Sequence, residues 1–82
     1  MELPDWWNWE LELTPHLLKR MVDRGFNEAD VRAMLDDVVN IVPQGNERFR
    51  VEAALEGKSW IVVLEPDPGD EAILVITAYP NQ

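Results

Sequence analysis

Two short helices predicted between Thr14 and Leu35 constrain the fold of this chain most strongly. Thr14-Pro15 is typical of a helix start, because Thr caps free backbone N–H groups and Pro suits the first helical position, where its missing N–H is not needed. Gly25 is typical of a helix end. Asn27 is a capping residue for a second helix. Helices this short need a surface to pack on, and the flanking segments must provide it.

Both predicted helices carry an apolar stripe at helical spacing. The stripes consist of Leu17, Leu18, Met21 and Val22 in the first helix, and of Val31, Met34, Leu35 and Val38 in the second. Phe26, between the helices, is expected to plug the core. The helix side of the core is therefore expected to comprise Met21, Phe26, Val31, Met34 and Leu35.

Strand patterns flank the helices. Residues 6–13 alternate between apolar and polar, which predicts a strand with one buried face and with Trp6 exposed. The residues of that buried face are Trp7, Trp9, Leu11 and Leu13. Residues 39–42 form either a short strand or an extended connection, which Pro43 stops.

Three further strands are predicted after the turn at residues 44–46. They cover residues 48–55, 58–65 and 72–79, and tight turns at residues 56–57 and 67–70 join them. Residues 73–76 are apolar on both faces, which is typical of a central strand.

The order of elements predicts an α+β fold, β-α-α-β-β-β, with two helices packed on one face of an antiparallel sheet. The 82 residues are expected to form a single domain over residues 1–82, with its core in residues 6–80. The first strand either joins an edge of the sheet or pairs with the last strand.

Two stretches of the chain together form a pattern. They are His16-x-x-x-Arg20-Met21-x-x-Arg24-Gly25-Phe26, followed by Val31, and the closing Val75-Ile76-Thr77-Ala78-Tyr79-Pro80. The pattern resembles a family of small bacterial and archaeal domains of unknown function. That family is grouped with the RelE-like toxins, in the wider barnase, EndoU, colicin and RelE ribonuclease fold. The resemblance covers residues 14–80 and implies two helices against an antiparallel sheet.

The resemblance also implies RNA cleavage as one activity. Basic and aromatic side chains on the sheet of such toxins position the phosphate and act as acid or base. A histidine beside arginines suits that chemistry, because His titrates near neutral pH and Arg stabilises negative charge. The candidate catalytic residues of a metal-independent ribonuclease are therefore His16, Arg20, Arg24, Arg50 and Tyr79. The alternative is that these arginines pair with nearby acids.

A second candidate is an anion-binding face of the sheet. Its residues would be Arg48, Arg50, Lys58, Thr77 and Tyr79. The alternative is a solvated face with cross-strand ion pairs. The tryptophans Trp6, Trp7 and Trp9 would either stack on bases or form a partner surface, or they would seal one end of the core with Trp60.

Charge separates these functions. Sixteen acidic residues against seven basic ones give a formal net charge of −9, whereas nucleic acids are bound mostly by Lys and Arg, and toxins of this group are usually basic. The composition therefore favours a non-catalytic interaction or accessory module whose partner is another protein or a second copy of the chain. The toxin-type ribonuclease of a toxin–antitoxin-like system, acting on RNA or ribosomes, is the alternative.

Composition gives no support to a metal or cofactor site. There is one histidine and no cysteine, so neither a thiolate metal site nor a disulfide framework is expected. The N-terminal residues lack the basic start and apolar core of a signal peptide, and no apolar run approaches a membrane span. A cytoplasmic protein with no membrane contact is the expectation.

Overall fold

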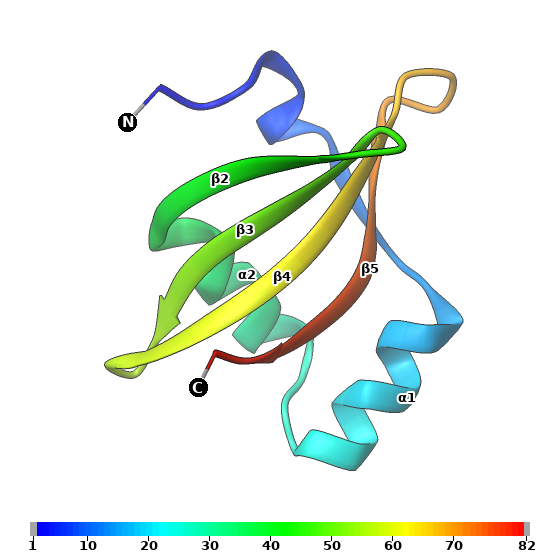
Figure 1. Cartoon of the computed structure of the whole chain (residues 1–82). Coiled ribbons are helices and arrows are strands. Elements are labelled where there is room, and N and C mark those ends of the chain that lie inside the picture. Colours follow the sequence, from blue (N-terminus) through cyan, green and yellow to red (C-terminus); the bar gives the residue numbers. More distant parts are fainter. Residues whose placement is uncertain (1, 82) are drawn as a thin grey trace.

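A curved, twisted sheet with two helices makes up the described chain, which is residues 2–81 of a computed structural model (Figure 1). In chain order the elements are the 3-10 turn η1 (Asp5–Asn8), β1 (Glu10–Leu13), α1 (Pro15–Arg24), α2 (Glu28–Asp36), β2 (Val38–Gly45), β3 (Arg48–Leu55), β4 (Lys58–Asp67) and β5 (Ala72–Pro80). The α+β class is therefore confirmed, although with one more strand than the order β-α-α-β-β-β.

The sequence predicts a wholly antiparallel sheet, and this is wrong for one pair of strands, because the sheet is mixed. Its strand order is β1-β5-β4-β3-β2, and β1 pairs parallel to β5 while the other pairs are antiparallel. The first strand thus satisfies both expectations, since it lies at an edge and pairs with the last strand. The helices and three strands that separate β1 from β5 supply the long connection that parallel pairing requires.

The N-terminal tryptophan segment is a turn followed by a strand, so the strand predicted over residues 6–13 is wrong in its first half. The N–H of Trp7 donates to the carbonyl of Pro4, and that of Trp9 to the carbonyl of Trp6, each at 3.0 Å. These bonds curl the chain, and extended pairing begins only at Glu10. Trp6, expected to be exposed, is half-buried and packs against the core like Trp7.

The predicted helix ends are confirmed. Thr14 Oγ1 accepts a hydrogen bond from the N–H of Leu17 at 3.3 Å, and Pro15 occupies the first helical position. Gly25 ends α1 in the left-handed conformation at φ 71°, which glycine adopts without a steric penalty. Asn27 and Asp30 form a reciprocal capping box, in which each side chain accepts the other's backbone N–H at 3.0 Å.

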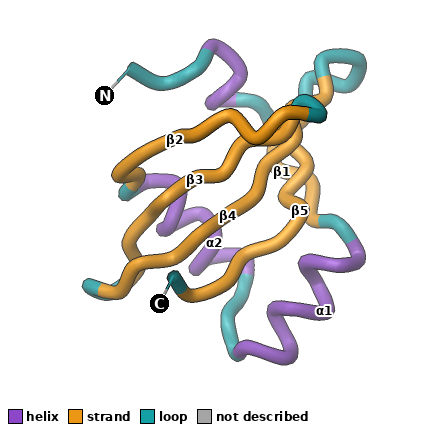
Figure 2. The backbone as a smooth tube through the Cα atoms, in the orientation of Figure 1, coloured by secondary structure: helices purple, strands orange, loops and turns teal. Residues whose placement is uncertain are grey.

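The apolar stripe of α1 is only half buried. Leu17 is fully buried, but Leu18 is 48% exposed and Val22 is 83% exposed. The reason is the place of the helix: α1 lies beside β5 at the margin of the sheet, whereas α2 lies behind the sheet and contacts β3 (Figures 1 and 2). A helix at the margin presents one flank to the core and leaves the other in solvent.

The core fills the side of the sheet that faces α2. Val31 and Met34 are fully buried, and Phe26 is 6% exposed with its ring 5.2 Å from that of Trp60 in an edge-to-face arrangement. Met21 and Leu35 pack against this cluster and are half-buried. The strand side of the core consists of Val51, Ala53, Trp60, Val62, Leu64, Ile73, Val75 and Ala78.

The edge strand β2 runs through Pro43, so the expectation that Pro43 stops this segment is wrong. Proline cannot donate to a ladder, but an edge strand has one side without a partner. Pro43 pairs with Phe49 and Ile41 with Val51. The N–H of Ile41 donates to Asn40 Oδ1 at 3.0 Å, to a side chain instead of a strand.

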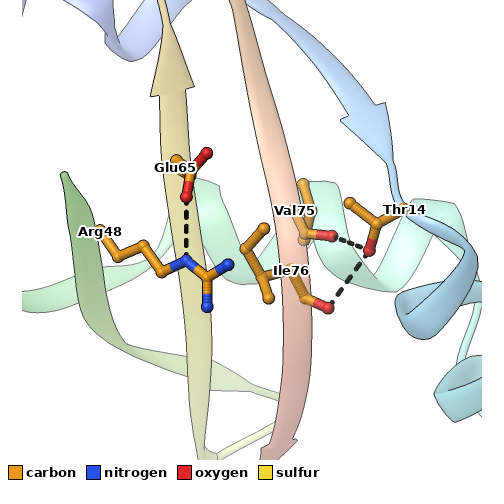
Figure 3. A network of polar contacts seen from close by, with 5 residues as sticks. All are labelled: Thr14, Arg48, Glu65, Val75 and Ile76. Atoms are coloured by element: carbon orange, nitrogen blue, oxygen red, sulfur yellow. Dashed lines mark hydrogen bonds and ion pairs between the residues drawn. The ribbon is translucent and has the colours of Figure 1, made fainter. Parts of the chain in front are cut away.

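Side chains at the two ends of α1 cover the free edge of β5. β1 pairs with β5 only as far as Val75. There the hydroxyl of Thr14 donates to the carbonyl oxygen of Val75 at 2.8 Å. The carbonyl oxygen of Ile76 lies 3.2 Å from the same hydroxyl and shares this hydrogen bond (Figure 3). The guanidinium of Arg24 donates to the carbonyl of Ala78 at 3.2 Å. Side chains of Thr14 and Arg24 thus satisfy strand carbonyls in the part of β5 that β1 does not pair with.

Replacing Thr14 by Ala is expected to lower the free energy of unfolding by about 1–2 kcal/mol, because the change removes a helix cap and a bond to the strand edge together. Chemical denaturation measures the loss. Thr14→Ser keeps the hydroxyl and should recover most of it. Equal losses for Ala and Ser would contradict a role for the hydroxyl.

Replacing Phe26 by Ala is expected to cost about 3–5 kcal/mol, because the ring is buried against Trp60 and a cavity would remain. That is a large part of the stability of a domain this small. Phe26→Leu, which fills more of the space, should cost less. A loss below about 1 kcal/mol for Phe26→Ala in denaturant titration would show that the ring adds little.

Candidate functional site

The five candidate catalytic residues do not form one cluster. His16, Arg20 and Arg24 lie on α1, beside the edge of β5. Arg50 lies on β3, two strands away in the sheet order. Arg50 and Tyr79 alternate with the core residues Val51 and Ala78, so both face the side of the sheet opposite the core, which we call the open face. The candidates thus come from two places, the helix and the open face, although the guanidinium of Arg24 reaches the β5 edge at Ala78, next to Tyr79.

Most of the arginines are engaged in ion pairs with acids nearby. These pairs are Arg20–Asp23 at 3.5 Å, Arg32–Glu28 at 3.1 Å, Arg48–Glu65 at 2.9 Å and Arg50–Glu52 at 3.7 Å. Figure 3 shows the Arg48–Glu65 pair, which joins β3 to β4. Partly exposed pairs such as these contribute little to stability, because solvent screens them. They do reduce the positive charge that a phosphate would meet, as expected in the alternative interpretation of these arginines.

The open face carries an apolar centre with a polar surround. Register places Val63 between Arg50 and Thr77, and Ile61 between Glu52 and Tyr79. Ile61 is fully buried and Val63 is 9% exposed, although no helix of the described chain covers this face.

The neighbouring half-buried side chains therefore fold over the centre of the open face. Three of the residues predicted for an anion-binding face, Arg50, Thr77 and Tyr79, do share it, and Glu52 lies among them. Arg48 is on the same face, paired with Glu65.

Lys58 does not belong to the open face, and this part of the prediction is wrong. Lys58 is two residues from Trp60 on the same strand, so its side chain points to the helix side. There it lines an open hollow of about 520 Å³, the basic hollow, whose lining consists of Arg24, Lys58, Ser59, Trp60, Pro80 and Asn81. The amide of Asn81 donates to the hydroxyl of Ser59 at 3.2 Å.

The basic hollow joins two cations that are far apart in the sequence, so reading the sequence alone missed it. None of its described lining residues is an acid or a histidine. The hollow can attract an anion by charge, but it offers no general base and no activated nucleophile.

The turn η1 and the β2–β3 and β4–β5 turns lie at one end of the sheet, away from the β3–β4 turn that precedes Lys58 (Figure 1). Side chains from these segments line a second hollow. Its volume is about 290 Å³, and we call it the aromatic hollow; it is lined by Trp6, Trp9, Glu47, Phe49, Pro66 and Pro68. The rings of Trp6 and Phe49 are 5.0 Å apart and tilted by 48°. Trp6 and Trp9 reach the same hollow because residues three apart in a 3-10 turn lie on one side.

A groove of about 300 Å³ lies between the tryptophan segment and α2. Trp7 and Trp9 line one wall, and Arg32 and Asp36 of α2 line the other. Both charge signs are present at its rim, and Arg32 also pairs with Glu28. The groove therefore has no clear charge preference.

Within residues 2–81, no group of three or more His, Asp or Glu side chains is arranged to hold a metal ion. No helix in that range is long and apolar enough to cross a membrane.

Comparison with known proteins gave no match to any family model, any curated protein or any solved structure. The site must therefore be judged on its own geometry.

Replacing Arg24 by Met is expected to lower the free energy of unfolding by about 0.5–1.5 kcal/mol, because the bond to the Ala78 carbonyl is lost while the alkyl stem remains. Arg20→Met is the matched control on the same helix. Its ion pair with Asp23 is partly exposed and 3.5 Å long, so the change should stay within about 0.5 kcal/mol. Chemical denaturation of both variants checks this, and equal losses would contradict a special role for Arg24.

Proposed function

We propose that this protein is a non-catalytic interaction module that binds a partner protein of opposite charge. The observation that carries the proposal is the distribution of its cations. Arg20, Arg48 and Arg50 are paired with carboxylates, and Arg24 is bonded to a backbone carbonyl. Cations engaged in this way are less available to a phosphate or to a reacting group.

A relationship to the RelE-like toxins is part of the proposal. It is supported by two consecutive capped helices followed by an antiparallel run of strands that ends in Thr77-Ala78-Tyr79-Pro80. In this interpretation the chain retains a toxin-like scaffold and uses it for binding.

The ribonuclease alternative requires a general base and a phosphate site within reach of one another. His16 lies on α1 while Arg50 and Tyr79 lie on the open face, and Arg50 is 3.7 Å from Glu52. A phosphate at Arg50 would meet that carboxylate. The separation of the candidates and the acid among them both favour binding over cleavage.

The charge of the chain indicates the kind of partner. A net charge of −9 speeds encounter with a positively charged surface and slows encounter with a polyanion. A second copy of the chain would bring the same net charge, which opposes a homodimer at low salt. Salt screens these effects beyond about 8–10 Å, so contacts must supply the specificity.

The purified protein is expected not to cleave RNA. Seven basic residues, several of them paired, are too few to neutralise the roughly 6–10 phosphates of a tight complex. The test is incubation of the wild type with a mixed RNA and with translating ribosomes, followed by gel analysis of RNA length. His16→Ala and Arg20→Ala are run in parallel. Cleavage by the wild type that either substitution abolishes would overturn the proposal and assign α1 to a ribonuclease site.

A further inference from the structure

We propose that the aromatic hollow holds a single arginine or lysine side chain of a partner polypeptide. The aromatic rings would contact the cation, and the Glu47 carboxylate would neutralise it. This inference rests on the proposed function and names the part of the surface that carries its specificity.

The lining of the hollow suits a cation and does not suit an anion. Of the described residues that line it, Glu47 alone is charged. Pro66 and Pro68 have no backbone N–H to offer to an acceptor. The faces of Trp and Phe rings carry negative charge density, which attracts guanidinium and ammonium groups placed over them. Both the π-faces and the carboxylate therefore select positive charge.

The hollow leaves room for an occupant. Trp6 and Trp9 line it and are only half-buried, so part of each side chain stays accessible. The volume of about 290 Å³ is at the lower end of the range for ligand pockets, so it fits one long side chain better than a large ligand.

Most charged residues in the segments that build the hollow are acids. Residues 1–9 contain Glu2 and Asp5 and no base, and residues 65–71 contain four acids and no base. The nearest cation along the chain to Glu47 is Arg48, which is paired with Glu65 at 2.9 Å and faces the other side of β3. A partner cation entering the hollow thus meets attractive charge on every contributing segment.

Two other occupants are compatible with aromatic rings alone. Proline-rich peptides dock in grooves lined by aromatic residues, and nucleic acid bases stack on tryptophan. Neither requires the carboxylate of Glu47, and the acidic segments repel a nucleic acid backbone. The charge of the site favours a basic side chain over both.

The test measures the affinity of short blocked peptides for the 82-residue chain by calorimetry. Two-dimensional NMR of the tryptophan indole N–H groups then shows where on the protein each peptide binds. The main probe alternates arginine with glycine. Its matched control carries citrulline, which has nearly the same shape as arginine but no charge. A proline-rich peptide and an oligouridine RNA test the other occupants.

The arginine peptide is expected to bind at least about tenfold more tightly than the citrulline peptide. It is also expected to shift the indole signals of Trp6 and Trp9 but not that of Trp60, at the other end of the sheet.

A pair of matched variants separates the hollow from the general charge of the protein. Glu47 and Glu56 both lie in hairpin turns with positive φ, at 63° and 51°, and at opposite ends of the sheet. Glu47→Gln and Glu56→Gln therefore remove the same charge from similar backbone conformations. Glu47→Gln is expected to weaken the arginine peptide about fivefold or more, and Glu56→Gln to leave its affinity within about twofold. Trp6→Leu, checked for folding by thermal melting, should weaken it as well.

Each remaining outcome overturns the inference. If both glutamine variants weaken binding equally, long-range charge alone attracts the peptide, and the proposed function stands without this site. If the proline-rich peptide or the RNA shifts the indole signals of Trp6 and Trp9 while the arginine peptide does not, the hollow has a different occupant. If no basic peptide binds, the inference fails, and the RNA cleavage assay decides the proposed function separately.

Discussion

The hydroxyl group of Thr14 is the contact on which the arrangement of the chain depends. It accepts the N–H of Leu17 and so begins α1, and it donates to the Val75 carbonyl on the edge of β5. The first strand, the first helix and the last strand therefore meet at one side chain. Leu17, whose N–H bonds to this hydroxyl, is fully buried. The cap of α1 therefore lies directly beside the hydrophobic core. This junction fixes the start of α1 against the edge of β5.

Local signals predicted the elements of the fold well, and long-range geometry set the limits. The caps at Thr14, Gly25 and Asn27 and the hairpin turns depend on residues next to each other, so the sequence alone predicts them. The parallel pairing of β1 with β5 depends on where the chain returns after the helices. The exposure of Val22 depends on α1 lying at the margin of the sheet. No local pattern contains that information.

The candidate sites follow the same rule. Alternation along β3 and β5 predicted that Arg50 and Tyr79 share a face, because strand periodicity is local. The basic hollow and the aromatic hollow join segments far apart in sequence, such as Trp6 with Phe49, and could be found only in the folded chain. Lys58 lies on the helix side because it pairs across the hairpin with Leu55, which packs against the core, and so it cannot share the face of Arg50.

The outer side of the edge strand β2 lacks free backbone N–H donors at two positions, which affects how other polypeptides can bind there. Ile41 and Pro43 are two apart on the edge strand, so their nitrogens point the same way, and neither offers a free N–H: one is bonded to the Asn40 side chain and the other has none. A foreign strand aligned there would find few donors for a continuous ladder. Pairing of a foreign strand along this part of β2 is therefore disfavoured, and recognition at this edge is expected to come from side chains instead of an added strand.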